Sequence, residues 1–433
     1  MKNILKILLL LNGLLWAVSS QAVLELEITK GVEGAIPIAI IPFVNSGKPG
    51  ASIDVAAIVA TDLLRSGKFS PLAEDKLLAK PTSLDAVNYK LWRTASIDHL
   101  VIGQIHSRQS GEYELQFRLL DVFKGVQVLG YKFRANEQTL RRTIHHISDL
   151  IYQHVTGQKG AFNTTIAYVT VERKAKAAPV FRLQVADTDG HNSQTVLTSD
   201  EPIMSPAWSP DGSRLAYVSF ENQRSEIYIQ HLSDQQREKV SSQAGINGAP
   251  VWSPDGNKLA LTLSKGSNTD IYILDLASKK LTQLTRHWAI DTEPGWTPDG
   301  SEIVFTSSRS GKPQIYKIGL FGGKAKRLTF EGNYNANPEL SPDGKQLVFV
   351  QGNGRHFKIA IMDLETRFVQ ILTDGVLDES PSFAPNGSMI LYASQSGNRG
   401  VLAAVSSDGR YKQKLVLSEG DVREPTWGPF RRQ

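Results

Sequence analysis

The sequence contains no cysteine, and its one long apolar run lies at the N-terminus. Without cysteine the chain has no disulfide, no thiol nucleophile and no cysteine-ligated metal site. The apolar run covers Ile7 to Val18, follows Lys2 and Lys6, and precedes the small-residue pattern Ser20-Gln21-Ala22. A membrane anchor is the alternative to a signal peptide, but spanning a bilayer takes about 20 apolar residues. We therefore interpret residues 1–22 as a secretory signal peptide and expect no transmembrane segment in the mature chain.

Charge of one sign is also scarce, because 48 lysines and arginines face 43 aspartates and glutamates. The formal net charge is +5, and it includes the two lysines of the expected signal peptide. No basic run gathers this small excess in one place. Binding of nucleic acid needs a concentrated basic surface, so we expect none.

Motifs for catalysis are missing as well. The chain has no Gly-x-Ser-x-Gly and no His-Glu-x-x-His, and its glycine-rich stretches lie between expected strands rather than before a helix. His145 and His146 are adjacent on an expected helix and point about 100° apart, which suits structural roles better than a zinc site. We predict a protein that is not an enzyme, with no catalytic residue and no bound metal.

A repeated motif occupies the C-terminal two-thirds of the chain. Its motif prolines recur every 43 or 44 residues, and a second set of prolines four residues earlier keeps the same spacing. Each repeat contains four short runs of alternating apolar residues, the pattern of β-strands. Repeats of this length with four strands are typical of propeller blades. The motif prolines are Pro210, Pro254, Pro298, Pro342, Pro385 and Pro429.

The last repeat is cut short, because the chain ends directly after its first strand. Segments before the first motif, including Thr165 to Val171 and Phe181 to Asp187, supply the missing strands. We predict a ring of six blades closed by pairing of the C-terminal strand with a strand near residue 165. An aromatic residue just before each turn should wedge between blades, and Leu340 is the smaller exception.

The region before the repeats has a different pattern, with expected strands at 38–43, 99–106, 113–123 and 127–133 and expected helices at 53–66, 84–95 and 137–156. Residues 23–160 therefore form a small N-terminal α/β domain, and the β-propeller covers residues 161–433. The fold class is an α/β N-terminal domain followed by an all-β six-bladed β-propeller.

Two interpretations compete for the segment Val23 to Gly31, in which apolar residues alternate with polar ones. It is either an ordinary edge strand of the α/β domain or a mobile peptide that adds to a partner as a strand.

Loops that lead from the last strand of one blade to the first strand of the next gather on one face of a propeller, opposite the Pro-Asp-Gly turns. These loops differ between repeats while the turns stay nearly constant, and a binding role would explain the diversity. Acidic residues in the loops make calcium at the channel mouth conceivable; they are Glu201, Asp291, Glu293, Asp378, Asp421 and Glu424. The alternatives are plain solvated loops, a hydrolase or lyase, and a sugar-binding propeller with Trp288 and Tyr334 as platforms.

Several segments together resemble the TolB family, the periplasmic components of the Tol-Pal system of Gram-negative bacteria. The resemblance covers the mature chain and rests on the N-terminal module joined to the repeats. Its segments are Ile41-Pro42-Phe43, Ser66-Gly67-Lys68-Phe69, Gly157-Gln158-Lys159-Gly160-Ala161-Phe162, Met204-Ser205-Pro206-Ala207-Trp208, Asn247-Gly248-Ala249-Pro250, Thr292-Glu293-Pro294 and Leu377-Asp378-Glu379-Ser380-Pro381. Ile246 departs from the histidine that TolB sequences often carry.

The resemblance implies a periplasmic, monomeric adaptor that binds the lipoprotein Pal through the propeller and the C-terminal domain of TolA through the N-terminal segment. Other outer-membrane or peptidoglycan-associated proteins are possible further partners. The implied roles are outer-membrane integrity, constriction at division and protein import. Carried onto this chain, the Pal contacts are Met204, Asn247, Ala249, Thr292, Glu293, Asn337, Asp378 and Glu379, and the TolA contacts are Val23, Leu24, Glu25, Leu26, Glu27 and Ile28. We expect Ala249 to admit a partner loop, with Asn247 and Thr292 donating hydrogen bonds and Glu293 accepting one.

Overall fold

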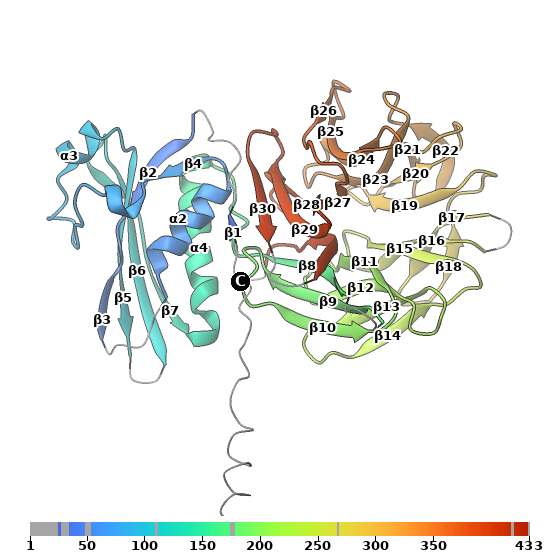
Figure 1. Ribbon diagram of the computed structural model, residues 1–433, viewed down its shortest axis with the longest axis horizontal. Coiled ribbons are helices and arrows are strands. Elements are labelled where there is room, and N and C mark those ends of the chain that lie inside the picture. The colour runs from blue at the N-terminus through green and yellow to red at the C-terminus, as the bar shows by residue number, and fades with distance from the viewer. Residues whose placement is uncertain are drawn as a thin grey trace, which may run out of the picture.

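The computed structural model describes residues 25–26, 34–47, 53–108, 111–173, 178–265, 268–416 and 420–431. An α/β domain lies beside a β-propeller (Figure 1). The expected signal peptide lies outside the described residues. No helix among the described residues is long and apolar enough to cross a membrane.

The N-terminal domain is a sheet with strand order β4-β2-β5-β6-β7, in which β3 also pairs with β5. Its strands are β2 (Ile36–Ile40), β3 (Val44–Gly47), β4 (Phe69–Pro71), β5 (His99–Ser107), β6 (Glu112–Asp121) and β7 (Val126–Asn136), and its helical segments are α2 (Val55–Arg65), η1 (Glu74–Lys76), α3 (Tyr89–Thr94) and α4 (Glu137–Thr156). The sequence predicts a helix over 84–95, but within this range only Tyr89–Thr94 forms one.

Helix α4 begins and ends where its sequence has capping residues. Asn136 accepts a hydrogen bond from the Thr139 amide at 3.0 Å, and Thr139 Oγ1 accepts one from the Asn136 amide at 3.0 Å. Gly157, with φ 77°, ends the helix in the left-handed region that glycine tolerates. The expected apolar stripe of α4, including Ile144 and Ile147, is buried in the core with the strands of the sheet.

Six four-stranded blades form the propeller, which confirms the predicted fold class. We number them by repeat, and each is given from its inner strand outward. Blade 1 contains β31 (Asp421–Trp427), β8 (Thr165–Glu172), β9 (Val180–Asp187) and β10 (Gln194–Ser199), and blade 2 contains β11 (Ile203–Trp208), β12 (Arg214–Ser219), β13 (Glu226–His231) and β14 (Arg237–Ser241). Blade 3 contains β15 (Asn247–Trp252), β16 (Lys258–Leu263), β17 (Asp270–Asp275) and β18 (Leu281–Gln283), and blade 4 contains β19 (Asp291–Trp296), β20 (Glu302–Ser307), β21 (Gln314–Gly319) and β22 (Gly322–Arg327). Blade 5 contains β23 (Tyr334–Leu340), β24 (Gln346–Gly352), β25 (Phe357–Asp363) and β26 (Val369–Ile371), and blade 6 contains β27 (Glu379–Phe383), β28 (Met389–Ser396), β29 (Arg399–Ser406) and β30 (Lys412–Val416).

The ring closes in blade 1, where the last strand of the chain pairs with β8. The two strands are antiparallel, and Trp427 lies opposite Ile166. Closure by the two ends of the propeller removes the exposed edges that an open array would leave.

The Pro-Asp-Gly turns repeat the same hydrogen bonds on one face, which we call the turn face. In blade 2, Asp211 Oδ1 accepts the Ser213 amide at 3.1 Å and the Ser209 hydroxyl at 2.6 Å, and Gly212 has φ 71°. Burial raises the pKa of Asp211, but these hydrogen bonds outweigh it and lower the pKa to about 2. The aspartate is therefore a structural part of the turn.

The N-terminal domain packs on the turn face at blades 6 and 1. The turn of blade 6 carries Asn386 where most turns carry aspartate. Asn386 Nδ2 donates to the Lys159 carbonyl at 2.8 Å, and Gln158 Nε2 donates to the Asn386 carbonyl at 2.6 Å. An aspartate in this place has no N–H for the first of these bonds. The departure from the repeat therefore serves the contact between the domains.

Buried charges strengthen the same contact. His145 of α4 lies between Asp62 of α2, with Nδ1 2.7 Å from Oδ2, and Asp189 of the β9–β10 turn, with Nε2 3.3 Å from Oδ2. Arg65 donates to Asp62 at 2.6 Å and to the Thr188 carbonyl at 3.0 Å. Burial lowers the pKa of His145, but the two aspartates outweigh it and raise the pKa to about 9. The expected structural role of this histidine is thus realised between two domains.

Candidate partner-binding face of the propeller

The face opposite the turns is the mouth of the central channel, where the six inner strands begin. The channel has a volume of about 750 Å³. Each inner strand contains a bulge, and the residue just before its proline has a positive φ between 43° and 53°. All six of these residues line the channel; they are Ser205, Ala249, Glu293, Asn337, Ser380 and Glu424.

A positive φ is uncommon outside glycine, and it costs about 1 to 2 kcal/mol per residue unless neighbouring contacts hold it. The pairing on both sides of each bulge supplies those contacts here. Bulges re-aim side chains and cluster at functional sites. Six equivalent strained positions around one opening thus indicate a surface built to present side chains inward.

The structure brings five of the eight expected Pal contacts together around this channel. They are Met204, Ala249, Glu293, Asn337 and Glu379. A sixth, Thr292, is partly exposed beside them, with its hydroxyl 3.4 Å from that of Thr262. Glu293 already accepts the Asn337 amide at 2.8 Å and the Thr306 hydroxyl at 2.7 Å.

The role expected for Asn247 is wrong, because the residue is fully buried and its side chain is used internally. Asn247 Oδ1 accepts from the Ser241 hydroxyl at 2.6 Å and the Gln243 amide at 3.0 Å, and Nδ2 donates to the Gln243 carbonyl at 2.8 Å. Such a group has no capacity left for a partner. Asn247 holds the loop that precedes its strand.

Asp378 is also buried, which contradicts a surface contact through its side chain. Its Oδ1 accepts the Ser394 hydroxyl at 2.6 Å. Asp378 lies three residues before the proline of its inner strand, the earlier of the two prolines that recur in each repeat. Asn247, Asp291 and Asn335 have the same position in their own repeats. Four blades thus carry a buried Asp or Asn at this position, whose side chain is bonded inside the protein. We call these four the latch residues: Asn247, Asp291, Asn335 and Asp378.

Five of the six carboxylates expected to surround a calcium ion form hydrogen bonds or ion pairs within the chain. Asp291 accepts from the Ser307 hydroxyl at 2.6 Å and pairs with Arg309 at 2.5 Å, Asp421 pairs with Arg173, and Glu424 accepts the Ser205 amide at 2.5 Å. Among the described residues, the one grouping of three potential metal ligands lies at the domain contact and consists of His145, Asp187 and Asp189. Calcium at the mouth stays a prediction that this arrangement does not favour.

Carboxyl groups line the channel, where desolvation raises the pKa of Glu379 and Glu424 and raises that of Glu339 to about 7. Glu339 accepts the Phe383 amide at 2.8 Å. The residues that line this channel include no histidine, lysine or cysteine.

Large apolar side chains are exposed on the loops around the mouth. Ile246 and Ile290 precede two of the buried latch residues and are 52% and 53% exposed, and Trp288 is 77% exposed. Phe330 and Val376 lie on the loops that lead into blades 5 and 6 and are also exposed. Contiguous exposed apolar groups are typical of protein–protein contacts, although Phe321 and Phe368 are also exposed in turns of the opposite face. The contacts expected from the sequence were mostly polar. The apolar residues Ile246 and Ile290, directly before Asn247 and Asp291, were the sequence signal for this surface.

The N-terminal segment contributes two described residues, which pair with the propeller. Strand β1 (Glu25–Leu26) is antiparallel to β30, with Glu25 opposite Val416 and Leu26 opposite Leu415 (Figure 1). The other expected TolA contacts, Val23, Leu24, Glu27 and Ile28, lie outside the described residues. The sheet order β1-β30-β29-β28-β27 joins this segment to the strand that carries Glu379.

Fold and site together define a class: an α/β domain fused to a six-bladed propeller whose mouth presents exposed apolar and hydrogen-bonding groups. Comparison with known proteins identifies the family. Residues 152–431 match the TolB beta propeller domain, and residues 24–128 match the TolB amino-terminal domain. The chain belongs to the TolB family of Tol-Pal system proteins.

Full-length relatives agree with this assignment. The Tol-Pal system protein TolB of Thioalkalivibrio sulfidiphilus is 59% identical over 99% of both chains, and that of Nitrosococcus oceani is 57% identical over 98% of both. The crystal structure of TolB from Acinetobacter baumannii is 43% identical, with a TM-score of 0.87 over 94% of this chain and all of that one.

Proposed function

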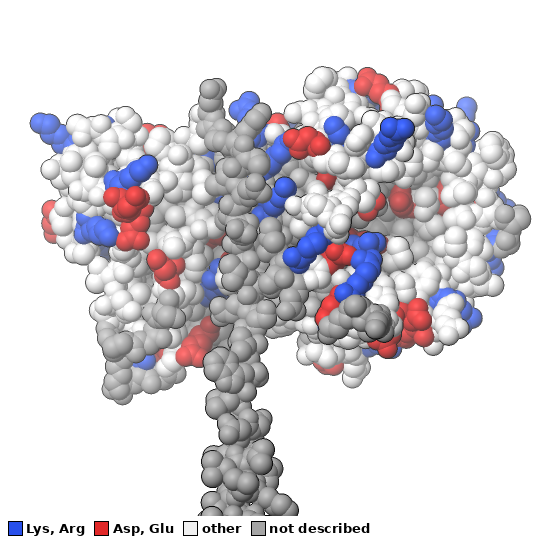
Figure 2. All heavy atoms as spheres, in the orientation of Figure 1, with Lys and Arg blue, Asp and Glu red and all other residues white. Residues whose placement is uncertain are grey.

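We propose that this protein is a non-enzymatic periplasmic adaptor of the Tol-Pal system. The propeller mouth binds Pal, the N-terminal segment binds the C-terminal domain of TolA, and the complex supports outer-membrane integrity and constriction at division. The observation that carries the Pal site is the ring of six strained inner-strand residues beneath the exposed apolar loops. Figure 2 shows Lys and Arg interspersed with Asp and Glu over the face of the molecule that it draws.

Ala249 is the most sensitive position for this contact. It lines the channel with φ 43°, and its methyl group is the smallest side chain among the six strained residues. A bulky side chain here would fill the mouth without entering a blade core. Binding of purified Pal to Ala249→Trp tests the site directly, and undiminished affinity would contradict it.

The pairing of β1 with β30 supports a switch for TolA. Capture of Glu25 and Leu26 by TolA competes with their backbone pairing on blade 6, because a strand edge bonds one partner at a time. Pal at the mouth touches the same sheet through β27, so it biases this equilibrium. TolA titrations with and without saturating Pal measure the coupling, and equal affinities would reject it.

Deletion of residues 23–31 separates the two contacts. The shortened protein loses TolA binding and keeps Pal binding, because the mouth is built without this segment. Loss of both partners would show that the assignment of one partner to each region is wrong.

A further inference from the structure

The six joints between blades differ in how their gaps are filled. Each inner strand ends in the wedge residue, which packs on the preceding blade. Trp252 shares a core with Ala216, and Trp296 shares one with Ala260. These two indoles also donate their N–H groups to the preceding inner strand, Trp252 to the Ala207 carbonyl and Trp296 to the Val251 carbonyl, both at 3.1 Å.

Blade 5 breaks this pattern because Leu340 stands where the others have Trp or Phe. Leu340 packs on Val304, at the position where Ala216 and Ala260 pack on the tryptophans of the other blades. Valine is larger than alanine by two methyl groups, which do not fill the volume of the missing indole. A cleft of about 390 Å³ remains on the turn face between blades 4 and 5. Apolar side chains form its wall, namely Val304, Leu328, Leu340 and Leu364.

The rim of this blade 4–5 cleft is charged. Lys317 pairs with Glu302 at 2.7 Å, and the exposed Asp299, Asp343 and Arg367 surround the opening. An apolar floor with a polar rim has the composition of a protein-binding pocket, and its volume lies within the range of ligand sites.

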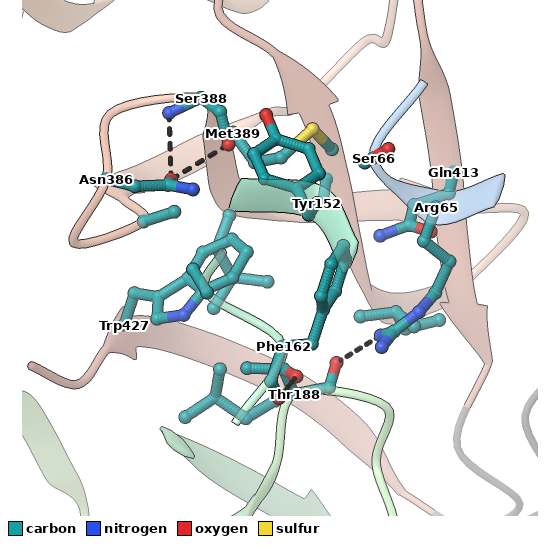
Figure 3. Close-up of a pocket in the computed structure, with 16 residues that line it drawn as sticks. Arg65, Ser66, Tyr152, Phe162, Thr188, Asn386, Ser388, Met389, Gln413 and Trp427 are labelled. Carbon is teal, nitrogen blue, oxygen red and sulfur yellow. Dashed lines mark hydrogen bonds between the residues drawn. The ribbon is translucent and has the colours of Figure 1, made fainter. Parts of the chain in front are cut away.

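The joint between blades 6 and 1 shows what such a cleft accepts. Its Ser388, Met389 and Leu391 occupy the places that Ser301, Glu302 and Val304 have in the blade 4–5 cleft. Here two aromatic rings from outside the blade pair enter the space beside Trp427; they belong to Phe162 of the interdomain segment and Tyr152 of α4 (Figure 3). Only about 30 Å³ stays empty.

From these two joints we infer that the blade 4–5 cleft is a second docking site, which takes an aromatic side chain carried on a segment of a protein partner. Five joints hold a ring from their own inner strand, and the joint between blades 6 and 1 also takes the rings of Phe162 of the interdomain segment and Tyr152 of the N-terminal domain. The blade 4–5 joint has a leucine in this place, and its cleft is open. The cleft lies on the turn face, opposite the mouth, and the N-terminal domain covers blades 6 and 1 instead. The inference is therefore separate from the sites proposed for Pal and TolA.

A capped amino acid is the simplest probe of the site. We expect N-acetyl-tryptophanamide to shift the methyl NMR signals of Val304, Leu328, Leu340 and Leu364 in the full-length protein at millimolar concentration. N-acetyl-leucinamide, the matched control, should bind at least tenfold more weakly, because the aryl ring supplies the complementary shape. Leu340→Trp fills the cleft from within and should weaken binding at least tenfold.

Three results would overturn the inference: no shift of these methyl groups, equal binding of the two probes, or undiminished binding to Leu340→Trp. If free indole binds but N-acetyl-tryptophanamide does not, the cleft is a small-molecule site, which would likewise overturn a protein partner. If Leu340→Trp does not fold, Val304→Phe blocks the cleft from the opposite wall and serves the same purpose.

Discussion

The turn face and the mouth face of the propeller are made by the same six repeats, yet their residues are held differently. On the turn face, aspartates such as Asp211 are bonded within their own turns. On the mouth face, Ser205 and its five equivalents have positive φ angles, and apolar side chains such as Trp288 are exposed. The difference shows that one repeat can combine a constant, internally bonded end with a variable end that the proposed function assigns to binding.

The largest effect should follow from Ala249→Trp. We expect Pal affinity to fall at least 100-fold, since an overfilled central contact loses roughly 3 kcal/mol or more. The melting temperature should stay nearly unchanged because the residue lies outside the blade cores. Gln235→Trp is the matched control. Gln235 also has a positive φ, of 57°, but it lies in the β13–β14 turn of blade 2, on the turn face. Isothermal titration with Pal measures both, and an equal loss in the two variants would end the distinction between the faces.

The next effect concerns the latch residues at the mouth. Asn247→Ala should lower the free energy of unfolding by about 2 to 4 kcal/mol, because the Ser241 hydroxyl and the Gln243 amide lose their buried partner. Asn337→Ala is the comparison, since no hydrogen bond of its side chain occurs among the described contacts. Denaturant unfolding compares the two. A stable Asn247→Ala variant would contradict the structural role of this residue.

A pH effect tests the charged contact on the turn face. The folded pKa of His145 is about 9, above its ordinary value of 6.5, so its contribution is complete below pH 6.5 and is lost as pH rises through 9. On the order of 2 to 3 kcal/mol should disappear across this window. His145→Gln should abolish this slope in unfolding measurements from pH 6 to 10. His146→Gln should keep it, because burial lowers the pKa of that neighbour.

The smallest effect is expected in a turn. Asn386→Asp restores the common Pro-Asp-Gly sequence but removes the N–H donated to the Lys159 carbonyl. The free energy of unfolding should fall by about 1 kcal/mol. Asp343→Asn makes the opposite exchange in blade 5, which does not carry the N-terminal domain. Thermal unfolding compares the two variants, and Asp343→Asn should leave the free energy of unfolding nearly unchanged. An equal loss of stability in both variants would assign the effect to the turn itself.

Much of the fold could be predicted from the sequence, because proline spacing and strand periodicity are local signals. The same is true of helix α4, whose capping residues lie within its own segment. The site was only partly predictable. Ala249 and Glu293 were correctly placed at the channel, although their contact with Pal stays a prediction. Asn247 was expected to be an exposed amide, and only the structure shows its buried hydrogen bonds to Ser241 and Gln243.

Sequence alone determined that six repeats form a ring and that one wedge position is occupied by leucine. These features depend on spacing and residue size, which need no knowledge of distant contacts. Tertiary structure decided that the ring of left-handed residues surrounds the mouth, that His145 lies between two aspartates from different domains, and that the Leu340 cleft stays open. Each of these depends on which distant segments meet, and burial and charge at such meetings are properties of the folded arrangement.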